Sequence, residues 1–172
     1  MKAIQFIEMT IGNMHQSLLS DVEGLKNEQL KWKPTHQANP IAFLFWHAAR
    51  AEDETVSEWR KKDSIWKENQ WYLKFKLDEK SYGTDFQEAD VNKIASLPFH
   101  QVIEYAEKVF RDTQIYIQSL DEDKLDYTPN PERPNWTTAQ MLNSLVISHG
   151  WWHIGEIRYV KGLQGIPWQK KS

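Results

Sequence analysis

Apolar residues recur at steps of three or four along four separate stretches of this chain, and this spacing restricts the possible folds more than any other feature. Such a step places the residues on one side of an α-helix, whereas a half-buried strand would alternate them every second residue. In the first stretch the repeating positions run from Ile4 to Leu25. The spacing predicts an all-α protein in which each helix packs its apolar side against a shared core.

The second and third helices are predicted from signals at their ends. Asn39 is a candidate N-cap with Pro40 as the first helical residue, and the helix continues to about Trp59. The third helix begins near Pro98, and its apolar side continues to Leu120. Both segments are long enough to span a bundle.

The fourth helix is predicted to begin at Thr137, which forms a capping box with Gln140. It ends near Gly162, and Pro167 prevents continuation. Residues 61–97 form a long crossover between the second and third helices. Within it, the weakly alternating segment from Trp71 to Leu77 is the one candidate for an extended strand. A long crossover permits parallel neighbours, so we expect a four-helix bundle of up-down-down-up topology, built as a single domain of residues 1–172.

Charge and hydropathy argue against nucleic-acid and membrane partners. The net charge is −3, and no stretch gathers Lys and Arg on one side, so the electrostatic footprint of a nucleic-acid-binding protein is missing. The longest apolar run, Ile41 to Trp46, is far shorter than the roughly 18 residues of a membrane helix. Lys170 and Lys171 are interpreted as a solvated tail. We expect a cytoplasmic protein.

The chain contains no cysteine. Disulfides, a cysteine nucleophile and cysteine metal ligands are therefore excluded, and any metal must be held by His, Asp or Glu. Any thiol chemistry would need a thiol brought by the substrate. The nine tryptophans are interpreted mainly as packing residues.

Two histidines, His149 and His153, are spaced four residues apart on the fourth helix, so both imidazoles leave the same side one turn apart. They interrupt an apolar stripe that includes Trp152 and continues through Ile157 to Val160. Two buried imidazoles without partners would be costly, so a shared metal ion is a natural explanation. His47 lies at a matching height if the second and fourth helices are antiparallel, and it is the expected third ligand. The alternative is that His47 only packs in the core.

The remaining polar residues have simpler interpretations. His15, His36 and His100 have no chelating partner at helical spacing and are taken as structural or surface residues. The acidic run Glu52, Asp53 and Glu54 is interpreted as a solvated surface.

Three imidazole ligands leave a tetrahedral ion with one open position, which is typical of catalytic rather than structural sites. The ion could then lower the pKa of its water or activate a thiolate. Glu156 follows His153 by three residues and is a candidate for orienting a ligand or moving a proton. Arg50 follows His47 by three residues and is a candidate for holding a substrate carboxylate. The alternative for this pair is a plain salt bridge between helices.

Taken together, the motifs resemble those of the DinB-like (DinB/YfiT-like) superfamily over nearly the whole chain. The matching features are Phe45-Trp46-His47 with Arg50 and Glu52, His149-x-x-x-His153-x-Gly155-Glu156, and the tail Gly162-x-x-Gly165-x-Pro167. The segment from Trp71 to Phe86 also looks like material found in some members.

The resemblance implies a four-helix bundle, a three-histidine site for Zn²⁺ or Ni²⁺, and frequent homodimers. Better-understood relatives are transferases and isomerases that depend on low-molecular-weight thiols such as bacillithiol or mycothiol, and others are described as metal-dependent hydrolases. The expected activity is therefore metal-dependent transfer of a small thiol to an electrophile. Hydrolysis by metal-bound water and a non-enzymatic, metal-stabilised stress-response or binding module are the alternatives.

Overall fold

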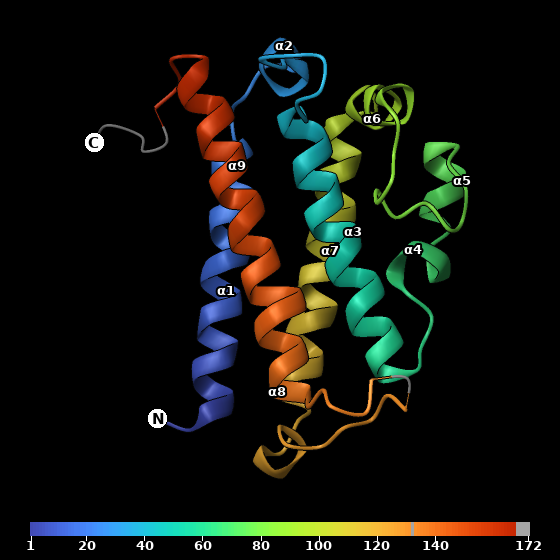
Figure 1. Cartoon of the computed structure of the whole chain (residues 1–172), viewed down its shortest axis with the longest axis vertical. Coiled ribbons are helices and arrows are strands. Elements are labelled where there is room, and N and C mark those ends of the chain that lie inside the picture. The colour runs from blue at the N-terminus through green and yellow to red at the C-terminus, as the bar shows by residue number, and fades with distance from the viewer. Residues whose placement is uncertain (132, 168–172) are drawn as a thin grey trace.

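The structure, a computed structural model, describes residues 1–131 and 133–167. Every regular element within these two ranges is a helix, which confirms the all-α prediction (Figure 1). In the same part of the chain, no helix combines the length and the apolar character that a membrane span requires.

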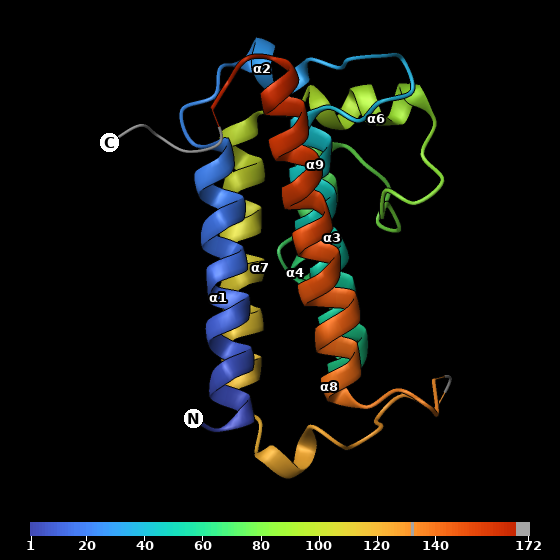
Figure 2. The ribbon, with the colours of Figure 1, turned by 60° about the vertical axis from the view of Figure 1, so that its left-hand side comes forward.

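Four long helices form the body of the molecule: α1 (Ala3–Val22), α3 (Ile41–Arg60), α7 (Phe99–Gln118) and α9 (His149–Leu163). Figure 2 shows α1 beside α7 and α9 beside α3, and the helices of each pair are in contact. In Figure 1, α1 and α9 run upward, whereas α3 and α7 run downward. The inward sides of these helices share one core, which includes the fully buried residues Ile11, Met14, Leu44, Phe45, Ala106, Val109, Ile154 and Ile157.

Helix α3 is the most buried of the four, because other elements surround it. Its N-cap is Pro40 and its first residue is Ile41, one position later than predicted from Asn39. It ends where Lys61 adopts a left-handed conformation with φ of 55°. α3 contacts α7, α9 and the crossover, so several of its polar residues are enclosed as well.

The prediction that Glu52 and Asp53 are solvated is wrong, because each is only 3% exposed. Both oxygens of Glu52 accept from Nε2 of His15 on α1, at 2.9 and 3.0 Å. His15 is itself buried and stacks on Phe110 of α7 at 4.0 Å between ring centroids. The acidic run therefore joins α3 to its neighbours, and only Glu54 of the three is partly open to solvent.

The crossover carries three short helices, α4 (Ile65–Glu68), α5 (Trp71–Phe75) and α6 (Glu88–Ala95). An extended segment from Trp71 to Leu77 is thus not formed. Trp71 and Phe75, spaced four apart, lie on the same buried side of α5 with ring centroids 5.3 Å apart. Four residues advance a helix by only about 6 Å, so the two rings meet, whereas in a strand the same residues would lie about 13 Å apart.

Asp53 fastens the start of the crossover to α3. Its carboxylate accepts from the backbone N–H groups of Ile65 and Trp66 at 2.8 and 2.9 Å, and from the hydroxyl of Tyr105 at 2.7 Å. Trp66 in turn donates its indole N–H to the carbonyl oxygen of Glu79 at 2.9 Å. These bonds hold the later part of the crossover, residues 79–83, against α3.

The shorter elements close the ends of the bundle. α2 (Asn27–Lys31) precedes α3, and the 3₁₀-helix η1 (Glu122–Lys124) follows α7. α8 (Thr138–Met141) begins with the predicted capping box, since the N–H of Gln140 donates to Oγ1 of Thr137 at 3.2 Å and the N–H of Thr137 donates to Oε1 of Gln140 at 2.9 Å.

From α8 the chain passes through the π-helical segment η2 (Leu142–Ser148) into α9 without a break. π-Helical turns are rare and often occur at functional sites. This one ends directly before His149. α9 ends at Leu163, one residue beyond the predicted end, and Lys170 and Lys171 lie outside the described residues.

Candidate metal centre

The three predicted ligands, His47, His149 and His153, meet between α3 and α9. One ring nitrogen of each lies within 4.8 Å of the others. The Nε2 atoms of His149 and His153 are 3.1 Å apart. The ring centroid of His47 lies 5.3 Å from that of His149 and 5.0 Å from that of His153. All three side chains are half-buried at the edge of the core.

The crossover sets the orientation of His47. Its Nδ1 donates to the carbonyl oxygen of Tyr82 at 3.0 Å. Because a carbonyl oxygen only accepts, Nδ1 carries the proton and Nε2 keeps its lone pair. The ring also stacks on Phe43 at 5.8 Å with an interplanar angle of 3°. The sequence alone does not reveal this contact, because the carbonyl oxygen belongs to a distant loop.

Glu156 plays the matching role for His153. Nδ1 of His153 lies 2.7 Å from Oε2 of Glu156. The hydrogen bond from His153 holds the pKa of Glu156 below its ordinary value, so Glu156 is a carboxylate near neutral pH. A carboxylate that accepts from Nδ1–H leaves Nε2 free for a metal, which is the usual outer-shell arrangement around histidine ligands.

Burial keeps two of the imidazoles uncharged. It lowers the pKa of His149 to about 4, and repulsion from His153 and His47 acts in the same direction. Burial also lowers the pKa of His47, followed by repulsion from His153. Imidazoles bind metal ions only as the neutral form, so neither residue needs to lose a proton near pH 7.

The donor set fits a divalent ion such as Zn²⁺ or Ni²⁺. Three convergent imidazole nitrogens suit both ions, and two of the three rings are held by hydrogen bonds at the nitrogen that faces away. Without an ion, two Nε2 atoms 3.1 Å apart can form a hydrogen bond only if one of them carries a proton. An ion would instead accept both lone pairs at once.

Comparisons with known proteins identify the family of this chain. The profile of the DinB superfamily matches residues 12–157, which include all three histidines. The chain belongs to the DinB superfamily. No curated protein matches it. A solved structure with the same fold is described as the crystal structure of the conserved protein of locus from Enterococcus faecalis. It has a TM-score of 0.80 at 22% identity, and the alignment covers 95% of this chain and 97% of that chain.

In this DinB-superfamily chain, Arg50 does not face Glu156. Arg50 is 1% exposed, and its Nε donates to the carbonyl oxygen of Ser81 at 3.0 Å. Its Nη2 lies 2.8 Å from Oε2 of Glu54, an ion pair without the alignment of a hydrogen bond. The interhelical bridge between Arg50 and Glu156 is therefore not formed. Arg50 holds the crossover residue next to Tyr82 instead.

Other parts of the predicted stripe lie elsewhere. Trp152 is 71% exposed rather than on the core side of α9, where Ile154 and Ile157 are buried instead. His36 and His100 are exposed, and His15 is paired with Glu52. None of these three histidines belongs to the cluster.

Gly83 also belongs to the site, although the sequence alone did not predict its contact with His47. Its φ is +99°, and a β-carbon there would lie 2.5 Å from Nδ1 of His47. Only glycine adopts this conformation and allows the loop to pack against the imidazole. The available signal was a lone glycine in the crossover, twelve residues beyond Trp71, and it pointed to a turn without indicating its neighbour.

Proposed function

We propose that this protein is an enzyme that binds one divalent metal ion, Zn²⁺ or Ni²⁺, through His47, His149 and His153. Its activity is transfer of a low-molecular-weight thiol to a small electrophile. The observation that carries the proposal is the convergence of three imidazole nitrogens within 4.8 Å of one another, with two of the rings oriented by outer hydrogen bonds.

The chain has no cysteine, so the sulfur nucleophile must enter with the substrate. A divalent ion supplies a positive charge that lowers the pKa of a thiol and favours the reactive thiolate. In the transfer, the thiolate sulfur forms a bond to the electrophilic carbon, and the leaving group departs with its electron pair.

Side chains around the three histidines have distinct roles in this proposal. Glu156 keeps His153 in the tautomer that binds metal, and as a carboxylate hydrogen-bonded to that ligand it is the proposed acceptor of the thiol proton. Arg50, one helical turn beyond His47, holds a carboxylate of the substrate. We further propose that the long helices form the up-down-down-up bundle, in which α3 and α9 are antiparallel neighbours, and that the protein is a homodimer.

Two other functions remain as alternatives. Hydrolysis of an ester or amide would use the same three ligands, with Glu156 as the proton carrier. A non-enzymatic binding or stress-response module would use the ion only to clamp α3 to α9. Thiol-independent turnover favours the first, and complete unfolding on chelation with no exchangeable ligand at the metal favours the second.

The proposal is tested by loading the protein with zinc or nickel and measuring conjugation of monochlorobimane with a panel of thiols: cysteine, glutathione, coenzyme A and bacillithiol. With at least one thiol, the rate should exceed that of the His149→Ala variant. His100→Ala is the matched control, because His100 is exposed and lies outside the cluster. No thiol-dependent rate above that of His149→Ala would rule out the proposal.

A further inference from the structure

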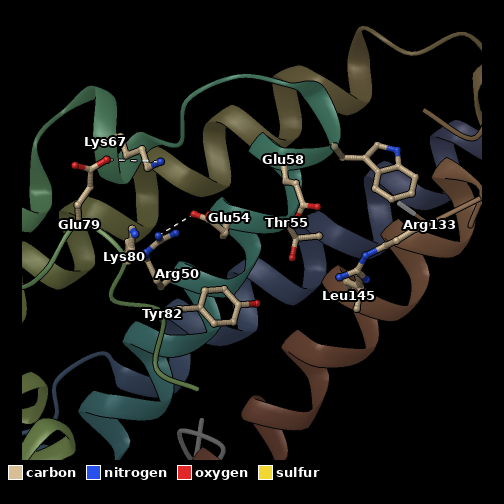
Figure 3. A pocket seen from close by; sticks show the side chains of 11 residues that line it. Arg50, Glu54, Thr55, Glu58, Lys67, Glu79, Lys80, Tyr82, Arg133 and Leu145 are labelled. Atoms are coloured by element: carbon tan, nitrogen blue, oxygen red, sulfur yellow. Dashed lines mark ion pairs between the residues drawn. The ribbon is translucent and has the colours of Figure 1, made fainter. Parts of the chain in front are cut away.

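A pocket of about 340 Å³ lies between α3, the crossover, the segment before α8 and η2 (Figure 3). None of the three histidines lines it, but its wall includes residues one helical turn from His47 and from His149. Arg50 and Tyr82 form part of its wall. Arg50 is one helical turn beyond His47, and the ring of Tyr82 packs edge-on against His47 with centroids 5.9 Å apart. Leu145 lines the opposite side, one turn before His149. The pocket therefore begins next to the candidate metal centre, and its volume suits a small molecule.

The pocket wall is strongly charged. Its charged residues are Arg50, Lys67, Lys80, Arg133, Glu54, Glu58 and Glu79. Each acidic group already has a partner: Glu54 pairs with Arg50, and Glu79 lies 3.6 Å from Lys67. Oε1 of Glu58 accepts from the amide of Asn130 at 3.0 Å. The negative charge of the wall is thus largely compensated by its own neighbours.

The positive charge is not fully compensated. Lys80 and Arg133 form no ion pair with any residue in the described ranges. Figure 3 shows Arg133 reaching from the segment before α8 toward Thr55 on α3, across the pocket from Lys80. The pocket therefore offers two cationic groups to a ligand, and Trp59 and Leu145 add apolar surface to the same wall.

Arg50 adds a buried donor without an acceptor. Its Nε is occupied by Ser81 and its Nη2 faces Glu54, but Nη1 has no hydrogen-bond partner among the residues that the structure describes. A buried guanidinium N–H without a partner is unfavourable, and a ligand oxygen in the pocket would supply the missing acceptor. The guanidinium is held in place, since it lies over the ring of Trp66 at 5.2 Å.

We propose that this pocket binds the carboxylate of a small organic acid, with Arg133 and Lys80 as the charged partners and Nη1 of Arg50 as a further donor. A singly charged carboxylate is favoured over a phosphate dianion, because Glu54 and Glu58 remain in the wall. The further statement that the ligand is the thiol substrate, with its sulfur toward the histidines, rests on the proposed function. The statement that the pocket binds a carboxylate is independent of that function.

The binding test uses metal-free protein and a thiol-blocked acid, 3-(methylthio)propionate, titrated by calorimetry at low ionic strength. The uncharged amide of the same acid and inorganic phosphate are the comparison ligands. We expect the acid to bind at least tenfold more tightly than the amide, and more tightly than phosphate. Equal binding of acid and amide, or tighter binding of phosphate, would overturn the proposal.

Arg133→Gln is the decisive variant, because Arg133 is exposed in a connecting segment and its loss leaves the core intact. Losing one charge-assisted hydrogen bond should weaken binding of the acid by about tenfold. Arg111→Gln removes the same charge from an exposed site on α7 outside this pocket and should leave binding unchanged. Arg50→Met should also lose binding, but it releases Ser81 as well. Native affinity in both Arg133→Gln and Lys80→Gln would show that the carboxylate does not bind here.

A second measurement separates this inference from the proposed function. With zinc-loaded protein, 3-mercaptopropionate should have a KM about tenfold lower than its amide, and Arg133→Gln should remove that difference. If the blocked acid binds but no thiol is conjugated, the pocket assignment stands and the proposed function fails. If both thiols react equally and the blocked acid does not bind, the proposed function stands and the pocket assignment fails.

Discussion

Gly83 packs directly against the imidazole of His47, and a β-carbon on Gly83 would lie 2.5 Å from Nδ1 of that ring and 3.1 Å from Trp46. The same Nδ1 donates to the carbonyl oxygen of Tyr82, the residue before this glycine. The crossover and the candidate metal ligand therefore fit together only while residue 83 has no side chain. This contact links the shape of a loop to the position of one ligand.

Replacing Gly83 by Ala should reduce zinc affinity, because the new methyl group displaces His47 or the loop that orients it. The positive φ adds strain, and we expect a loss of about 1 kcal/mol or more in the free energy of unfolding. Gly155→Ala on α9 is the matched control, since a β-carbon at that position would have nothing within 4 Å of it. Chelator competition measures the affinity, and unchanged zinc binding in Gly83→Ala would contradict this interpretation.

Single replacement of His47, His149 or His153 by Ala should sharply reduce metal content, because each supplies one of three ligands. Elemental analysis of protein purified without a histidine tag gives the occupancy, with one ion per chain expected for the native protein. His100→Ala should keep full occupancy. A variant at His47 with native occupancy would remove this residue from the site.

His15→Ala makes a contrasting prediction. It should lower the melting temperature, because Glu52 is left buried without its partner, at a cost of about 3–5 kcal/mol for a broken buried pair. It should nevertheless bind metal at a temperature where it is folded. Circular dichroism and metal analysis on the same sample separate the two effects, and loss of metal from folded His15→Ala would argue that α1 also shapes the site.

The metal-free protein should become less stable as the pH falls from 6.5 toward 4. The pKa of His149 is lowered to about 4 by burial in the folded state, against about 6.5 in the unfolded chain. Between these values the unfolded chain binds more protons, so the free energy of unfolding increases with pH in this window. Thermal melts of native protein and of His149→Gln over this range test the point. An equal pH dependence in both would assign the effect to other groups.

Glu156→Gln should weaken zinc binding by about 10–100-fold, the usual effect of losing an outer-shell carboxylate. Glutamine still accepts a hydrogen bond from His153 but lacks the charge that strengthens it. Glu104→Gln, on the exposed side of α7, removes the same charge away from the site and should bind zinc normally. Equal affinity in the two variants would show that Glu156 does not support the metal ligand beside it.

The helices were predictable because their signals are local. The stripe on α1 and the capping box at Thr137 involve residues within one or two turns of each other, and they appear in the structure close to their expected places. The meeting of His47 with His149 and His153 followed from one tertiary assumption, that α3 and α9 are antiparallel. In an antiparallel pair, His47 lies at the same level along the bundle as His149 and His153, and this comparison needed no side-chain detail.

Most of the failures involve contacts between distant segments. Glu52 and Asp53 looked solvated because neighbouring charges usually are, yet His15 and the backbone of the crossover enclose them. Trp152 follows His149 by three residues, but it precedes the buried Ile157 by five, and five residues turn an α-helix by about 500°, so the two face different sides of α9. The contacts of Tyr82 and Gly83 with His47 depend on how a long crossover folds back, which no short-range pattern encodes.

The two helices that carry the candidate ligands lie far apart in the order of synthesis. His47 leaves the ribosome early, whereas His149 and His153 emerge much later, because α9 is the final helix that the structure describes. A nascent chain therefore cannot assemble the three-histidine cluster until α9 has been made and docked on α3. Metal loading through this cluster would consequently follow the docking of α9, and a bound ion would distinguish chains in which α9 has docked on α3 from chains in which it has not.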